Sequence, residues 1–91
     1  MAVEVKLTAV LQKLTGGQKT VREDAGNVEE LLANLEKSYP GFLKQVQGED
    51  GKLHRFVNIY LNDEDIRYLS QLQTQLKSGD VVSILPALAG G

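Results

Sequence analysis

Apolar and polar residues alternate with a period of two at the start, in the middle and near the end of the chain. The alternating residues span 3–9, 56–61 and 81–85. Side chains of a β-strand point to its two faces in turn, so each segment is predicted to be a half-buried strand. We expect Val57, Ile59 and Leu61 on the core face of the middle strand, and Val82 and Ile84 on that of the last. Because these segments are far apart in the sequence, any sheet that contains them must pair strands over long sequence separations.

The first strand is predicted to run to about Leu11 and then to turn back. Thr15-Gly16-Gly17 is typical of a turn, and residues 18–22 around Val21 can return as a second strand of a hairpin. No helix with a following Lys-Ser or Lys-Thr accompanies these glycines, so a turn is favoured over a phosphate-binding loop.

One amphipathic helix is predicted between the strands. Asn27 followed by Glu30 is typical of a capped helix start, and Pro40-Gly41 ends the pattern. The apolar residues at helical spacing are Val28, Leu31, Leu32, Leu35 and Tyr39. A further short turn is expected around Phe42, Leu43 and Val46, followed by an exposed loop at residues 48–51.

Residues 62–65, Asn-Asp-Glu-Asp, are acidic enough to raise the question of a calcium loop. They lack the ligand spacing and the glycine of an EF-hand, so a solvated turn is the favoured interpretation. Leu69, Leu72 and Leu76 predict a short helical segment that Ser78-Gly79-Asp80 closes. The resulting order is strand, strand, helix, strand, short helix, strand, which is an α+β arrangement.

Composition excludes several kinds of chemistry. The chain has 91 residues, 42% hydrophobic and 24% charged, which fits one small domain without a deep substrate cleft. It has no cysteine and only one histidine, His54, so thiolate catalysis, cysteine-ligated metals and a His-His metal pair are excluded. The net charge is −2 with scattered Lys and Arg, which argues against a nucleic-acid partner. No run approaches membrane-spanning length, and we expect a cytoplasmic protein without a metal site.

The chain ends on Gly90-Gly91, directly after the apolar run 85–89. Glycine has no Cβ, so such an end can pass through a narrow enzyme channel and present its carboxylate. We therefore expect one domain with a globular body at 1–85 and a mobile tail at 86–91. Gly91 is the candidate reactive group, with Gly90 and Ala89 as the tail that delivers it.

The order of elements, with the last strand running into Gly-Gly, resembles the β-grasp fold of ubiquitin and of the MoaD/ThiS sulfur carrier family. Within this family the chain is most similar to carriers of the CysO type, which serve a thiocarboxylate-dependent route to cysteine. The similarity rests on residues 16–19 (GGQK), 51–60 (GKLHRFVNIY), 62–65 (NDED) and 84–87 (ILPA), and on the final Ala-Gly-Gly. The implied fold is a mixed sheet packed on one main helix.

The resemblance also implies a function. The chain would not be an enzyme and would bind no cofactor; it would be a covalent co-substrate of other proteins. An E1-like adenylating enzyme of the MoeB/ThiF type would join Gly91 to AMP from ATP, and a sulfur donor would convert the adenylate to a thiocarboxylate. The sulfur would pass to a pyridoxal-phosphate-dependent cysteine synthase that uses O-phosphoserine, and a metal-dependent peptidase would release the cysteine.

The same resemblance implies an apolar partner-binding surface near the tail. The outward face of the middle strand carries Phe56 and Tyr60, the last strand carries Leu85, and the tail carries Leu88. We expect these residues to form one exposed patch. Two other functions stay open: a sulfur carrier for molybdopterin or thiamin biosynthesis, and a ubiquitin-like modifier joined to lysines of target proteins. The sequence does not identify the sulfur donor or the oligomeric state.

Overall fold

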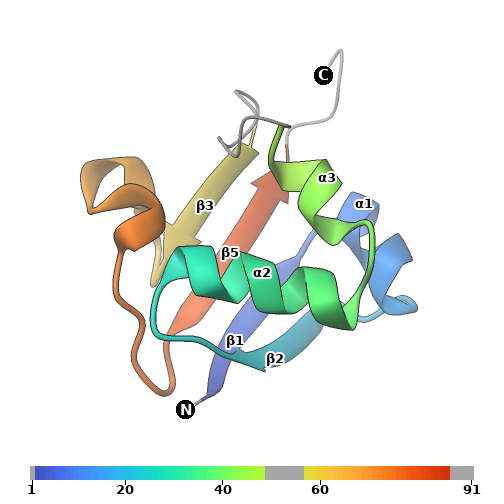
Figure 1. Cartoon of the computed structure of the whole chain (residues 1–91), viewed down its shortest axis with the longest axis horizontal. Coiled ribbons are helices and arrows are strands. Elements are labelled where there is room, and N and C mark those ends of the chain that lie inside the picture. Colours follow the sequence, from blue (N-terminus) through green and yellow to red (C-terminus); the bar gives the residue numbers. More distant parts are fainter. Residues whose placement is uncertain (1, 49–56, 87–91) are drawn as a thin grey trace.

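The computed structural model describes residues 2–48 and 57–86. Five strands form one mixed sheet in the order β2-β1-β5-β3-β4, and the main helix lies across one of its faces (Figure 1). The strands are β1 (Ala2–Leu7), β2 (Thr20–Asp24), β3 (Val57–Leu61), β4 (Glu64–Asp65) and β5 (Val81–Pro86). β5 runs parallel to β1 and antiparallel to β3, and β2 pairs antiparallel to β1. The expected β-grasp arrangement, an α+β fold with a mixed sheet on one main helix, is confirmed.

The expectation that the first strand reaches Leu11 is wrong. β1 ends at Leu7, and helix α1 (Ala9–Gln12) and the 3-10 turn η1 (Lys13–Thr15) follow. The backbone carbonyl of Thr8 accepts from the N–H groups of Leu11 and Gln12, and the Gln12 side chain donates to the carbonyl of Leu7 at 2.8 Å. Leu11 is fully buried, so a helical turn brings to the core a side chain that an extended strand would have carried past it.

The connection then closes with two glycines, as the sequence predicts. Gly16 and Gly17 have φ of 70° and 88°, a region that residues with a Cβ rarely adopt. The N–H of Gly17 donates to the carbonyl of Gln12 at 2.8 Å, and β2 begins at Thr20. β1 and β2 therefore form the predicted hairpin, but its loop contains a short helix.

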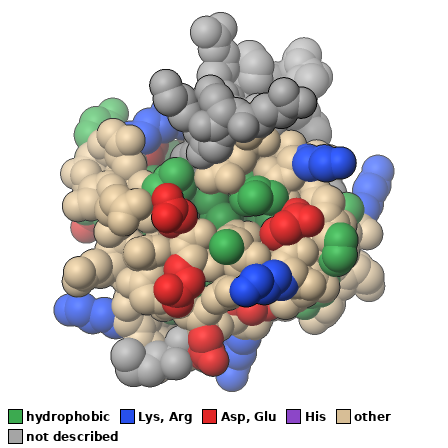
Figure 2. Space-filling view, viewed as in Figure 1, with side chains coloured by type: hydrophobic (Ala, Val, Ile, Leu, Met, Phe, Trp, Pro, Cys, Tyr) green, Lys and Arg blue, Asp and Glu red, His purple; other side chains and the backbone are tan. Residues whose placement is uncertain are grey.

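Helix α2 (Val28–Ser38) starts as the sequence predicts. Asn27 Oδ1 accepts from the N–H of Glu30 at 2.7 Å, and Glu30 Oε1 accepts from the N–H of Gly26 at 3.0 Å. The first bond satisfies a backbone donor that a helix start would leave unpaired, and the second ties the residue before the cap to the first turn of the helix. Four apolar residues of this helix are buried against the sheet: Val28, Leu31, Leu32 and Leu35. Figure 2 shows the helix-bearing face, where side chains of both charges surround a few visible apolar ones.

Helix α3 (Phe42–Val46) is fixed by a carboxylate of α2. The oxygens of Glu36 accept from the N–H groups of Gly41, at 3.1 and 3.2 Å, and of Leu43, at 2.8 Å. These backbone hydrogen bonds, first that of Leu43, lower the pKa of Glu36 because they stabilise its charged form. Phe42 and Val46 are thereby held fully buried in the core.

The core faces of the central strands match the prediction. Val57, Ile59, Val82 and Ile84 are all buried, and Ile59 lies directly opposite Ile84 across the β3–β5 pair. The acidic segment after β3 is a turn, as predicted: Asn62 and Asp63 have φ of 49° and 72°, as tight hairpins require, and β4 pairs back on β3.

The short helix expected from Leu69, Leu72 and Leu76 is not present as such. Two separate 3-10 turns, η2 (Ile66–Tyr68) and η3 (Gln71–Gln73), replace it. Gln71 has φ of 51°, which interrupts any continuous helix. Leu69 is 38% exposed, and Ile66 is buried in its place. Leu76 is buried because its N–H donates to the carbonyl of Gly26, which draws the segment onto the start of α2.

Candidate functional site

β5 carries the tail and lies in the interior of the sheet. It pairs with β1 on one side and with β3 on the other, and its last pair joins Pro86 to Val57. Pro86 therefore belongs to the globular body, one residue beyond the boundary expected from the sequence. We call the end of β5 and the residues paired with it the tail root. Ala89, Gly90 and Gly91 lie outside the described residues, so the structure defines where the tail begins and leaves its reactive end as a prediction.

A proline at this position suits the hydrogen-bond pattern. The N–H of Asn62 donates to the carbonyl of Val81, and pairing alternates along an antiparallel ladder, so the pair of Val57 and Pro86 is one that exchanges no backbone hydrogen bond. Proline has no N–H to donate, so it fits there without loss. The strand thus keeps its pairing with β3 up to its last residue.

Two of the four predicted patch residues lie on the outward face of the sheet. Leu85 lies opposite Asn58 and is 37% exposed, while Tyr60 lies opposite Ser83 and is half-buried. Tyr60 and Leu85 are therefore diagonal neighbours across β3 and β5, within reach of each other's side chains. Phe56 and Leu88 lie outside the described residues, so the complete patch stays a prediction.

Arg67 contacts the tail root from the turn after β4, and sequence reasoning missed it. Its Nη2 donates to the carbonyl of Val57 at 2.9 Å and to Oδ1 of Asn58, and its Nε lies 3.8 Å from Oδ1 of Asp65. The same Asp65 oxygen accepts from the backbone N–H of Arg67 at 2.9 Å. The guanidinium therefore ties the start of β3, which pairs with the end of β5, to the turn after β4. Asp65 followed two residues later by Arg67 is a local turn pattern that could have indicated the pair.

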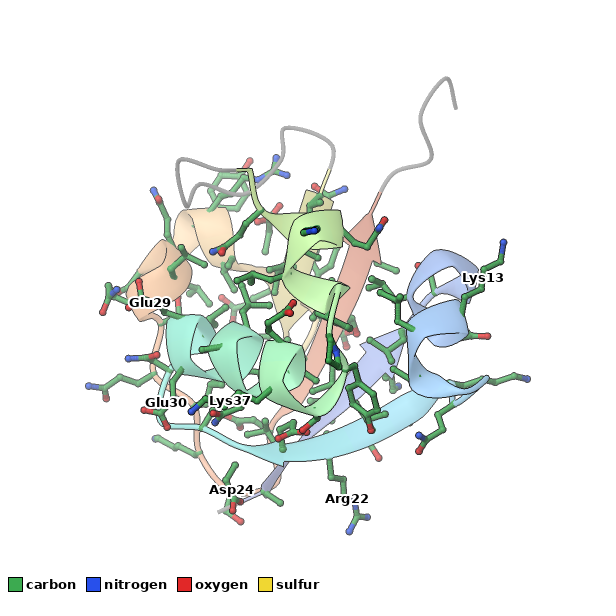
Figure 3. All side chains as sticks on the ribbon, turned by 45° about the vertical axis from the view of Figure 1, so that its right-hand side comes forward. Lys13, Arg22, Asp24, Glu29, Glu30 and Lys37 are labelled. Atoms are coloured by element: carbon green, nitrogen blue, oxygen red, sulfur yellow. The ribbon has the colours of Figure 1, made fainter. Side chains whose placement is uncertain are left out.

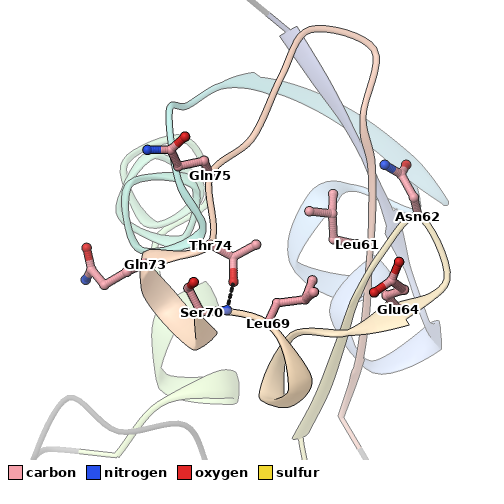
Figure 4. Close-up of a pocket in the computed structure, with 8 residues that line it drawn as sticks. All are labelled: Leu61, Asn62, Glu64, Leu69, Ser70, Gln73, Thr74 and Gln75. Carbon is pink, nitrogen blue, oxygen red and sulfur yellow. Dashed lines mark hydrogen bonds between the residues drawn. The ribbon is translucent and has the colours of Figure 1, made fainter.

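A hollow of about 560 Å³ opens at the other end of β3 (Figure 4). Leu61 and Leu69 are its apolar residues, and amides, hydroxyls and one carboxylate line the rest. Thr74 Oγ1 accepts from the N–H of Ser70 there at 3.1 Å. Because Val57 and Leu61 are opposite ends of one strand, this hollow is separate from the tail root.

In the part of the chain that the structure describes, neither a metal-ligand cluster nor a membrane-spanning helix is present. Residues 2–48 and 57–86 contain no group of three or more His, Cys, Asp or Glu side chains placed to hold a metal ion. Within the same residues, no helix has both the length and the apolar character needed to cross a membrane.

An interior strand that runs into the tail, on a five-stranded mixed sheet packed against one main helix, defines the ubiquitin-like β-grasp class. The ThiS family model matches residues 5–91. The chain belongs to the ThiS family.

Three relatives show how close this similarity is. The sulfur carrier protein CysO of Mycobacterium tuberculosis is 44% identical over 93 aligned residues, which cover all of both chains. A chain from the crystal structure of the Amycolatopsis orientalis BexX/CysO complex has a TM-score of 0.89 at 40% identity, covering 98% of this chain and 99% of that one. SAMP1 of Haloferax volcanii has a TM-score of 0.83 at 30% identity, with both chains fully covered. The resemblance to the MoaD/ThiS family and to CysO is confirmed.

Proposed function

We propose that the chain is a sulfur carrier of the CysO type that acts through a thiocarboxylate at Gly91. The observation that carries this proposal is the 44% identity to CysO over the full length of both proteins. The Gly90-Gly91 end and the interior position of β5 are consistent with it.

The first step is activation of the terminal carboxylate. At neutral pH a C-terminal carboxylate is negatively charged and repels nucleophiles, so it needs a leaving group. The carboxylate oxygen of Gly91 attacks the α-phosphorus of ATP on an E1-like adenylating enzyme of the MoeB/ThiF type, and pyrophosphate leaves. A sulfide equivalent from the sulfur donor then attacks the acyl carbon, AMP leaves, and Gly91 carries a thiocarboxylate.

The second step is delivery of the sulfur. The thiocarboxylate sulfur forms a bond to Cβ of an acceptor that a pyridoxal-phosphate-dependent synthase makes from O-phosphoserine by loss of phosphate. An S-to-N acyl shift then places cysteine in amide linkage at Gly91. A metal-dependent peptidase hydrolyses this amide, which releases cysteine and restores the carboxylate.

The body contributes position to this chemistry. It holds one sulfur atom covalently and brings it to each active site at the end of an anchored strand, so a bimolecular encounter with free sulfide is avoided. Tyr60 and Leu85 on the outward face, with Leu88 and Phe56, supply the apolar contacts with the adenylating enzyme.

Intact mass measurement of the protein purified from its own cells tests the proposal. Replacement of one oxygen by sulfur adds about 16 Da, and an attached cysteine adds about 103 Da. A variant without Gly90 and Gly91, expressed in the same cells, is the matched control and should carry neither addition. If the full chain also shows neither in cells grown under sulfur demand, the carrier function is contradicted.

A ubiquitin-like modifier is the second candidate, and one observation favours it. The chain is 32% identical over 94 aligned residues to the small archaeal modifier protein 3 of Haloferax volcanii, with full coverage of both. In this function Gly91 is joined to target lysines through isopeptide bonds. Immunoblots of a tagged chain would then show ladders of larger conjugates, which the variant without the two glycines would lack. A thiocarboxylate without ladders favours the carrier alone.

A further inference from the structure

β2 is an edge strand, and its outer side is open. The N–H of Leu7 donates to the carbonyl of Lys19, and the N–H of Glu4 donates away from β2, to the carbonyl of Asp80. Pairing alternates along an antiparallel ladder, so the N–H and C=O groups of Thr20 and Arg22 point away from the sheet. Within residues 2–48 and 57–86 no hydrogen bond uses these four groups.

On either side of this stretch, side-chain hydrogen bonds occupy the backbone carbonyls. The carbonyl of Gln18 accepts from Thr15 Oγ1 at 3.0 Å, and the carbonyl of Asp24 accepts from Asn34 Nδ2 at 2.6 Å. The open stretch is therefore bounded, and it offers two donors and two acceptors in the spacing that one added strand can use.

The opposite edge of the sheet is shorter, because its edge strand β4 has only two residues. β4 covers the end of β3, and the Arg67 guanidinium occupies the carbonyl of Val57 at the start of β3. An extended segment that pairs with this sheet therefore finds a longer run of open backbone on β2, which has five residues, than on β4.

Positively charged side chains around the open stretch determine which kind of segment can pair there. Lys6 lies opposite Thr20 on β1, Lys19 precedes β2, and Arg22 lies on it; all are exposed. Figure 3 shows the Arg22 side chain projecting from β2 away from α2. Among the described residues none of these cations has an ion-pair partner within 4.0 Å. Glu4 lies opposite Arg22 on β1, Glu23 accepts a hydrogen bond from Ser38 of α2, and Asp24 lies at the far end of the strand. The excess of positive charge therefore centres on 19–22.

We propose that the β2 edge binds an extended acidic segment of a partner protein as a sixth strand of the sheet. Backbone hydrogen bonds to Thr20 and Arg22 align the segment, and its carboxylates contact Lys6, Lys19 and Arg22. A second copy of this chain fits poorly, because it would bring a like set of cations to the same edge. β1 separates this edge from β5, so a partner can hold the edge while the tail enters an active site. The inference does not depend on the proposed function.

The test uses the full chain and a capped hexapeptide of alternating glutamate and valine. Titration followed by ¹⁵N–¹H spectra should shift the amides of Thr20 and Arg22 most, and hydrogen exchange at both should slow. The matching peptide of lysine and valine should bind at least tenfold more weakly. Raising NaCl from about 50 to about 500 mM should weaken glutamate-peptide binding several-fold, because exposed charge contacts are screened.

Two variants separate the backbone contribution from the charge contribution. Thr20→Pro removes an N–H that points to solvent, which an edge strand tolerates, leaves every charge in place, and should weaken binding at least tenfold. Lys19→Glu with Arg22→Glu keeps every backbone group and should abolish binding. Lys77→Glu, an exposed charge reversal in the loop before β5, is the control and should bind as the natural chain does. Thermal melts check that each variant is folded.

Three results would overturn the inference. The first is equal binding of the two peptides, and the second is a set of amide shifts centred on β3 or β5. The third is a concentration-dependent dimer in sedimentation that the double charge reversal leaves intact, because it would mean that a second copy occupies the edge.

Discussion

Truncation of Ile84 tests the register on which the tail root depends. Ile84 is fully buried and lies opposite Ile59 in a pair that exchanges no backbone hydrogen bond, where side chains approach most closely. Removing the buried carbons in Ile84→Ala should cost about 2–5 kcal/mol, and Ile84→Val about 0.5–1.5 kcal/mol.

These costs are large for a domain of this size. Stability of 0.05–0.15 kcal/mol per residue corresponds to about 5–14 kcal/mol for the 91 residues. Each kcal/mol lowers Tm by about 4–8 °C, so Ile84→Val should melt about 2–12 °C lower and Ile84→Ala at least about 8 °C lower. Ile84→Ala can therefore approach the limit of folding at the lower end of this range.

Urea unfolding followed by far-UV circular dichroism measures the free energy directly, and an unchanged slope shows that the unfolded state is the same. Ser83→Ala, on the outward face of the same strand, is the control and should change stability by less than about 0.5 kcal/mol. If Ile84→Ala is as stable as the natural chain while Ser83→Ala is not, the two faces of β5 are exchanged and the register is wrong by one residue.

Three further predictions concern the tail, a carboxylate and the outward face. Deleting Gly90-Gly91 should abolish the mass increase that a thiocarboxylate would give, without lowering Tm. Gly90→Ala should reduce loading less, because one methyl must enter a channel that fits bare backbone. Glu36→Gln should flatten the dependence of stability on pH. The folded pKa of Glu36 is lowered, so its contribution to stability is present above about pH 4.5 and is lost as pH falls through the folded pKa. Equal acid unfolding profiles of the variant and the natural chain would contradict this. Leu88→Asp and Tyr60→Ala should each weaken binding to the adenylating enzyme at least tenfold at unchanged Tm, and calorimetric titration that finds both affinities unchanged would remove the patch from the mechanism.

The parts of the fold that the sequence predicts are those with local patterns. Alternation places Ile59 and Ile84 on the core face, and the spacing of Asn27 and Glu30 locates the start of α2. Each of these depends on residues within one strand or one helical turn, so the pattern survives in a single sequence.

The parts that the sequence does not predict depend on contacts between distant segments. The turn after Leu7 looks extended by alternation, but the core needs Leu11, and a helical turn delivers it. Between β4 and β5 the spacing of leucines favours a helix, but Leu76 is held by the carbonyl of Gly26, fifty residues earlier in the chain. Tertiary hydrogen bonds outweigh helix propensity in such short segments.

The candidate site divides in the same way. Gly91 stays a prediction, whereas Tyr60 and Leu85 lie on the outward face, as the alternation of two strands predicts. Arg67 could not be found by alternation, because its guanidinium reaches Val57, ten residues away and across a turn. A residue that joins two segments produces no periodic pattern in the sequence of either segment alone.

The interior position of β5 has a mechanical consequence. An enzyme that draws the tail into its channel pulls along the axis of this strand, and the ladders to β1 and β3 run beside it on both sides. The pull therefore loads all these hydrogen bonds at once in shear, whereas a pull across an edge strand would break them one after another. The sheet therefore resists a pull on the tail with two ladders acting together.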